Sequence, residues 1–140
     1  MRKGFTLIEL LVVMVIISII LLVSIPFAKG AYEIAKATKI GRNLRNILQS
    51  AETFINMEKR IVENFSIESL REKKYLEVNI DESELSNYSI VATEINKHII
   101  VESIYTGEDV STNLVIERFP FIDSTENILY FKIRIGKWWK

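Results

Sequence analysis

A long apolar run near the start of the chain is the feature that most limits what this sequence can fold into. From Leu10 to Ile25 every residue is aliphatic or methionine, apart from two serines. A bilayer core about 30 Å thick is crossed by about 20 helical residues, and the apolar stretch of residues 5–27 reaches that length. The sequence therefore predicts a membrane-spanning helix over residues 5–27, and Pro26 predicts a helix kink near its end.

A single carboxylate, Glu9, lies inside this apolar stretch. A charged carboxylate at bilayer depth costs about 2.5–3.5 kcal/mol and is usually paired and functional. Lys3 lies at the membrane surface on a different helical face, but a cut after Gly4 would place the new amine of Phe5 one helical turn from Glu9. Alternatively, Thr6-x-x-Glu9 is a capping box at a helix N-terminus. The two roles are not exclusive.

The residues Gly4-Phe5-Thr6-Leu7-Ile8-Glu9, preceded by Lys3 and followed by the aliphatic helix, resemble the class III signal of type IV pilins and type II secretion pseudopilins. This resemblance implies cleavage by a prepilin peptidase between Gly4 and Phe5, and N-methylation of Phe5. It also implies that Glu9 pairs with the Phe5 amine of an adjacent subunit during assembly. The further partners it implies are other pilin-like subunits in a homo- or hetero-oligomeric filament, an assembly platform and an ATPase.

The charges before the apolar run set the expected orientation. Arg2 and Lys3 favour a cytoplasmic N-terminus by the positive-inside rule, so the rest of the chain is expected outside the cytoplasmic (inner) membrane as a single-pass protein. A rival interpretation is a secretory signal cut near Ala28-Lys29-Gly30. That alternative gives no reason for Glu9, and the apolar run is longer than usual for such a signal.

Composition limits the rest of the chain. Removing the membrane segment from 140 residues leaves about 80 residues for a head, which holds only a small core. The formal net charge is zero, with +5 in residues 1–60 (nine Lys/Arg, four Glu) and −5 in residues 61–140 (nine Lys/Arg, fourteen Asp/Glu), so nucleic acid is not indicated as a partner. The chain has no cysteine, which excludes a disulfide or a thiolate site. Many type IV pilins close their C-terminal region with a disulfide, and this chain departs from that pattern.

Residues 28–60 have the spacing of an amphipathic helix that continues from the membrane segment. Apolar residues recur at steps of three and four, namely Ile34, Ala37, Ile40, Leu44, Ile47, Leu48, Ala51, Phe54 and Ile55. We expect this stripe to pack on the head's own sheet, since it is too short and irregular for a coiled-coil seam. Gly30 and Gly41 are expected soft points in the helix.

The head is predicted to begin with an irregular acidic segment. Ser66 to Glu72 is typical of a short capped helix. The cluster of Glu77, Asp81, Glu82 and Glu84 lacks the glycine turn of a calcium loop, so we interpret it as solvated loop and expect no metal site.

The C-terminal part predicts strands at residues 88–95, 98–105, 113–119 and 128–135, with a tight turn at Asn96-Lys97. The expected fold class is α+β, with a long N-terminal helix packed on a small antiparallel sheet of about four strands. The expected domain organisation is a leader at 1–4, a transmembrane and assembly helix at 5–27, an amphipathic helix at 28–60 and a globular head at 61–140.

No catalytic constellation is present in the sequence. His98 is the only histidine and the five glycines are scattered, so we predict no enzyme activity, no phosphate loop and no cofactor. The end of the chain carries Trp138 and Trp139 between Lys137 and Lys140. These tryptophans suit stacking on bases or sugars, or anchoring at a headgroup layer. The alternative is that one of them packs under the sheet edge while the lysines only solvate it.

We therefore predict a structural subunit of a type IV pilus-like filament, either a type IV pilin or a secretion or competence pseudopilin. It would reside in membrane lipid until assembly and then in a pilus or pseudopilus outside the membrane. The alternative is a membrane-tethered envelope binding or sensor module with an ordinary uncleaved anchor.

Overall fold

The computed structural model describes residues 4–60, 65–76 and 80–139. It contains two compact units, one within residues 1–35 and the other within residues 36–140. Helix α1 (Leu7–Glu58) belongs to both units and is 52 residues long. The predicted long N-terminal helix is thus confirmed. The helix includes Pro26, and the kink expected at this residue stays a prediction.

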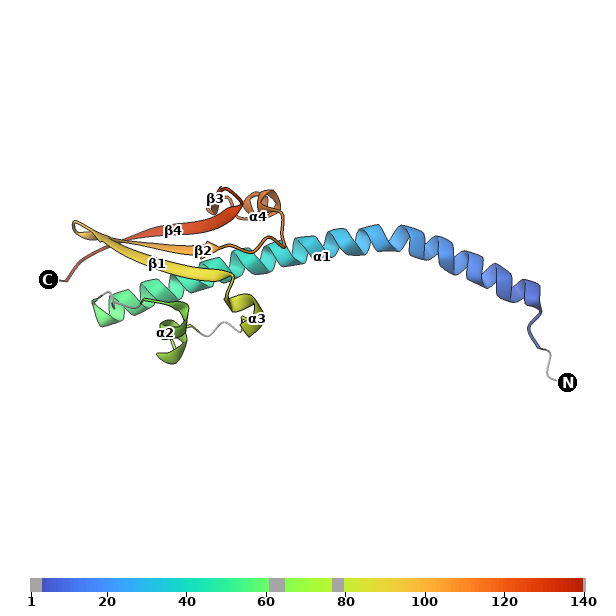
Figure 1. The fold of residues 1–140 in the computed structure, drawn as a ribbon, viewed down its shortest axis with the longest axis horizontal. Coiled ribbons are helices and arrows are strands. Elements are labelled where there is room, and N and C mark those ends of the chain that lie inside the picture. The colour runs from blue at the N-terminus through green and yellow to red at the C-terminus, as the bar shows by residue number, and fades with distance from the viewer. Residues whose placement is uncertain (1–3, 61–64, 77–79, 140) are drawn as a thin grey trace. The chain divides into compact units, whose positions relative to one another are not determined.

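The head, residues 36–140, contains a four-stranded antiparallel sheet in the order β1-β2-β4-β3 (Figure 1). Its strands are β1 (Tyr88–Ile95), β2 (His98–Tyr105), β3 (Asp123–Thr125) and β4 (Ile128–Gly136). The first two have the bounds predicted from the sequence. Ile95 pairs with His98, which confirms the two-residue turn at Asn96-Lys97.

The predicted strand at 113–119 is wrong, because this segment forms helix α4 (Thr112–Arg118). Three consecutive apolar residues, 114–116, satisfy a strand pattern and a buried helical turn equally well. In the structure Val115 is fully buried. The backbone N–H of Phe119 donates to the Val115 carbonyl at 2.9 Å, which closes the helix.

The third strand lies instead at Asp123–Thr125, a polar stretch between the predicted strands. It pairs with β4 across the turn Glu126-Asn127, in which both residues have positive φ (50° and 67°). Positive φ at both central residues is the geometry of the type I′ hairpin turn, whose twist matches that of paired strands.

The predicted α1 stripe packs on one face of this sheet and forms the core (Figure 1). The buried residues of α1 are Ala37, Ile40, Gly41, Asn43, Leu44, Ile47, Leu48, Ala51, Phe54 and Ile55. Ile34, expected at the start of the stripe, is exposed. The sheet contributes alternate buried residues, as the period of two requires, among them Ile99 and Val101 of β2.

Two polar contacts inside this core connect the sheet to α1. The hydroxyl of Ser103, which is fully buried, donates to the Leu44 carbonyl at 3.0 Å. The side-chain amide of Asn43 donates to the Tyr88 hydroxyl at 3.1 Å. Because buried polar groups are costly unless they are hydrogen-bonded, these bonds favour one placement of the sheet on the helix.

Gly41 has a packing role, and its expected role as a soft point of the helix stays a prediction. A Cβ built on Gly41 would lie 2.3 Å from Cδ2 of the Phe119 ring. The absence of a side chain therefore lets the segment after α4 pack directly on the backbone of α1.

The acidic segment before the sheet forms two short helices, α2 (Ile67–Glu72) and α3 (Glu82–Leu85). Helix α2 is capped by Ser66 in a reciprocal capping box, as the sequence predicted. Of the acidic cluster, Glu77 lies outside the described residues, whereas Glu84 and Asp81 lie 2.7 and 3.5 Å from Lys39 Nζ. Within the described ranges no group of three or more His, Cys, Asp or Glu side chains is arranged to hold a metal ion.

A polar network lies where α1 enters the head. Lys36 forms an ion pair of 2.5 Å with Asp109, which also accepts a hydrogen bond from the Tyr105 hydroxyl. Burial of Asp109 raises its pKa, but hydrogen bonds from Lys36 and Tyr105 outweigh this effect and the pKa is lowered overall. Burial raises the pKa of Tyr88 to about 12, and burial and the neighbouring Asp109 also raise the pKa of Tyr105. The loop after β2 is therefore bound to α1 through charged and hydrogen-bonded groups.

Candidate processing and assembly site

Gly4 and Phe5, the predicted cleavage residues, precede helix α1 and extend into solvent. Phe5 is 88% exposed, and a Cβ added to Gly4 would meet no atom of the chain within 4 Å. The chain itself therefore does not require glycine at position 4. A requirement for glycine there, if processing has one, must come from a partner that binds this segment.

Thr6 and Glu9 form the capping box that the sequence offered as one of two roles for Glu9. The backbone N–H and the hydroxyl of Thr6 donate to Glu9 Oε2 at 2.8 and 2.9 Å, and the Glu9 N–H lies 3.4 Å from the Thr6 hydroxyl oxygen. The Thr6 carbonyl accepts the Leu10 N–H at 3.2 Å. Thr6 is thus the N-cap residue of α1, and its side chain and that of Glu9 satisfy each other's backbone donors.

Both hydrogen bonds from Thr6 reach the same carboxylate oxygen of Glu9. Its Oε1 atom accepts no hydrogen bond from the residues that the structure describes. Since an ionised carboxylate has about four lone-pair sites, the capped Glu9 retains an acceptor for another donor. Cleavage after Gly4 would leave Thr6 in the chain, so the box and a second contact to Glu9 are compatible.

The helix that follows this box presents an uncovered apolar surface. The large apolar side chains between residues 5 and 27 are 48–88% exposed. Over an 18-residue window the mean hydropathy reaches 3.1, so by length and composition the helix suffices to cross a membrane. The long apolar helix fits an inner-membrane anchor.

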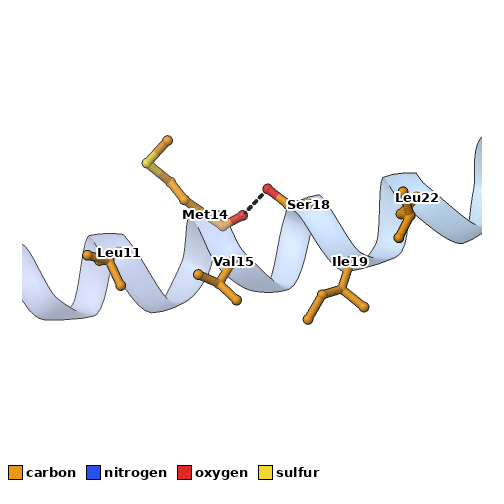
Figure 2. Close-up of a pocket in the computed structure, with 6 residues that line it drawn as sticks. All are labelled: Leu11, Met14, Val15, Ser18, Ile19 and Leu22. Carbon is orange, nitrogen blue, oxygen red and sulfur yellow. Dashed lines mark hydrogen bonds between the residues drawn. The ribbon is translucent and has the colours of Figure 1, made fainter.

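One polar side chain in this helix is satisfied within its own turn. The Ser18 hydroxyl donates to the Met14 carbonyl at 2.8 Å (Figure 2). Serine bonded in this way removes its own need for a partner in an apolar medium. Around it lies a shallow hollow of about 580 Å³, lined by Leu11, Met14, Val15, Ser18, Ile19 and Leu22.

The other singled-out residues do not join this site. Lys3 lies outside the described residues, and His98 is an exposed strand residue next to a turn. The two tryptophans differ, because Trp139 is half-buried against the core whereas Trp138 is 66% exposed. Trp138 contacts Asn56, 82 positions earlier in the chain, and no local pattern indicated that pairing.

Comparison with known proteins bears on the same segment. Residues 1–25 match the family model described as the prokaryotic N-terminal methylation motif, which is the class III signal of type IV pilins and pseudopilins. No curated protein and no solved structure matches the chain. The motif indicates a pilin- or pseudopilin-type precursor, for which a structural rather than enzymatic role is expected.

Proposed function

We propose that this protein is a structural subunit of a type IV pilus-like filament, either a type IV pilin or a secretion or competence pseudopilin. The observation that carries the proposal is the methylation motif at residues 1–25. It coincides with the uncovered apolar part of α1, whose single acidic residue, Glu9, takes part in the N-terminal cap. In an ordinary anchor the helix cap would be the whole role of Glu9, whereas a pilin-like subunit also uses its charge.

Processing would come first. A prepilin peptidase cuts between Gly4 and Phe5 and methylates the new amine of Phe5. The exposure of Phe5 and the open space around Gly4 support this step, because the peptidase needs access to that peptide bond.

Assembly would follow through the N-terminal helix. The helices of several subunits leave the bilayer and bury their apolar faces against one another, while the heads form the filament surface. The Phe5 ammonium of one subunit then binds Oε1 of Glu9 in its neighbour, while Oε2 of that Glu9 stays hydrogen-bonded to Thr6 of its own chain. In a low-dielectric surrounding a buried charge is costly, and the attraction to a partner of opposite charge offsets that cost. If either partner is removed, the other charge is left buried without compensation.

The proposal implies a location and a set of partners. The precursor is a single-pass protein of the cytoplasmic (inner) membrane with a cytoplasmic N-terminus, as Arg2 and Lys3 favour. Its partners are the peptidase, other pilin-like subunits, an assembly platform and an ATPase. The proposed division is a leader at 1–4, a membrane and assembly helix at 5–27, an amphipathic helix at 28–60 and a head at 61–140.

The N-terminal mass of the protein, isolated from cells that contain a prepilin peptidase, tests this function. We expect a chain that begins at N-methylated Phe5 and that appears in filaments sheared from the cells. An intact Met1 together with absence from the sheared fraction would favour the membrane-tethered binding module with an uncleaved anchor. A start near Ala31 would indicate an ordinary secretory signal.

A further inference from the structure

A small hollow lies at the end of the head where α1 terminates, away from the polar network at Lys36. It has a volume of about 390 Å³ and is lined by Asn96, Lys97, Lys137, Trp138 and Trp139. The β1–β2 turn supplies the first two residues, and the segment after β4 supplies the others (Figure 1). The Lys137 N–H donates to the Lys97 carbonyl at 2.9 Å, which keeps the two segments together beyond the end of the strand.

The exposed indole of Trp138 is held in place on several sides. Its Nε1 lies 3.4 Å from Oδ1 of Asn56, and Nζ of Lys59 lies 4.8 Å from the ring centroid. Its ring meets that of Trp139 edge to face, with centroids 5.6 Å apart. Trp138 nevertheless remains 66% exposed. A large aromatic ring that is held by such contacts offers a preorganised stacking surface on the part that Lys59 and Trp139 leave open, since less side-chain entropy is left to lose on binding.

Polar donors stand beside this ring. The ammonium of Lys137 lies 2.8 Å from Glu94 Oε1, whereas Lys97 is exposed and forms no ion pair within residues 4–60, 65–76 and 80–139. The side-chain amide of Asn96 adds hydrogen-bonding capacity at the turn. An aromatic wall with a few convergent polar groups in a hollow of about 300–1,000 Å³ is typical of a small-molecule site.

The lining of the hollow selects among the ligands that stack on an indole. Its cations are Lys97 and Lys137, and Lys137 is already paired with Glu94. This is a poor match for a polyanion such as nucleic acid, whose affinity depends on many cationic contacts. A sugar ring offers a flat C–H face for the indole, and its hydroxyls suit Asn96. A single carboxylate on that sugar would have Lys97 as its partner, which the described residues leave without an ion pair.

We propose that this hollow binds an acidic saccharide, with one sugar ring stacked on Trp138 and its carboxylate on Lys97. This site is independent of the N-terminal motif, so a chain that fails to form filaments can still bind the saccharide, and the reverse also holds. Trp138 is the stacking group, and Asn56 and Lys59 position its ring.

The two tryptophans of the chain both line this hollow, so intrinsic tryptophan fluorescence reports on the site alone. The full chain is purified in an amine-oxide detergent, because a detergent with a sugar headgroup would compete. It is titrated with a neutral tetrasaccharide, with a tetrasaccharide that carries one uronic acid residue, and with single-stranded oligothymidylate. We expect a saturable change with the acidic sugar and binding about tenfold weaker with the neutral one.

Substitutions then test the two contacts separately. Trp138→Ala leaves Trp139 as the reporter and should weaken binding by about tenfold or more, whereas Trp138→Phe should retain part of it. Lys97→Gln should weaken binding of the acidic sugar only, and Lys74→Gln, an exposed lysine outside the hollow, should leave it unchanged. Unaltered circular dichroism shows that each variant folds.

Three results would overturn the proposal. They are no saturable change with the acidic sugar, unaltered affinity in Trp138→Ala, and tighter binding of the oligothymidylate than of either sugar. Equal affinity for the acidic and neutral sugars would overturn the role of Lys97.

Discussion

Replacing Glu9 by glutamine should abolish filament assembly while leaving the start of α1 intact. Glutamine retains a carbonyl oxygen that accepts the Thr6 N–H, and glutamine serves at this position of a capping box as well as glutamate. What is lost is the negative charge that would meet the Phe5 ammonium of a neighbouring subunit. Removing one partner of a buried ion pair costs about 3–5 kcal/mol, which corresponds to a fall of at least about a hundredfold in the association constant.

Thr6→Ala is the matched variant that weakens the cap and leaves the charge in place. It removes the hydroxyl bonded to Glu9 Oε2 at 2.9 Å, but not the backbone N–H bonded at 2.8 Å. Loss of an N-cap side chain costs about 1 kcal/mol, which amounts to about fivefold. The pairing mechanism therefore predicts a much larger defect for Glu9→Gln than for Thr6→Ala.

The assay is the fraction of processed protein in sheared and pelleted filaments, compared with the fraction left in membranes. Normalising to processed protein, identified by N-terminal mass, separates assembly from any effect of position 6 on cleavage. Glu33→Gln, an exposed residue of α1 outside the apolar stretch, controls for loss of a charge as such. If Glu9→Gln assembles normally, or if the two variants are equally impaired, Glu9 is only a helix cap and the pairing mechanism is refuted.

Four further predictions follow from particular contacts. Gly4→Leu should block processing, because a side chain there obstructs the close approach of the peptidase. It should leave membrane insertion unchanged, because a Cβ at this position meets no atom of the chain within 4 Å. N-terminal mass spectrometry should find the leader retained, and normal cleavage would contradict this. A fragment that starts near Ala31 should be folded, soluble and monomeric by circular dichroism and sedimentation, whereas aggregation would mean that the α1 stripe needs an external partner. Gly41→Ala should lower the melting temperature by a few degrees. Its Cβ would lie 2.3 Å from the Phe119 ring, a severe overlap that puts the overpacking cost toward the upper end of about 1–3 kcal/mol, above the helix propensity gain of about 1 kcal/mol. A raised melting temperature would refute it. The free energy of unfolding of the head should fall between pH 10 and about 12. The folded-state pKa of Tyr88 is raised from 10.0 to about 12, so in this range the unfolded state ionises first. Chemical denaturation of Tyr88→Phe should show a smaller fall, and an unchanged dependence of the unfolding free energy on pH would show that Tyr88 does not contribute.

The parts of this protein that the sequence predicted depend on interactions between neighbours in the chain. The Thr6–Glu9 box spans three residues, and the length of the apolar run is a property of composition alone. The alternation along β1 and β2, joined by a two-residue turn, was likewise local, and both strands have the predicted bounds. Backbone hydrogen bonding within a turn and the periodicity of burial therefore determined the start of α1, the amphipathic stripe and the central hairpin.

Tertiary structure decided the parts for which the local pattern was ambiguous. The apolar residues 114–116 fit a strand and a helix equally, and α4 forms where Val115 is buried and Phe119 packs on Gly41. The short strand β3 exists because it pairs with β4 across a turn of two positive-φ residues, although its own sequence is polar.

The contacts that position functional side chains also came from tertiary structure. The ion pair of Lys36 with Asp109 and the bond of Trp138 to Asn56 join residues far apart in the sequence. The sequence spacing within either segment does not predict these pairings, because each depends on which face of α1 the sheet covers. That choice is made by the burial of the whole stripe from Ala37 to Ile55 together with buried hydrogen bonds such as Ser103 to Leu44.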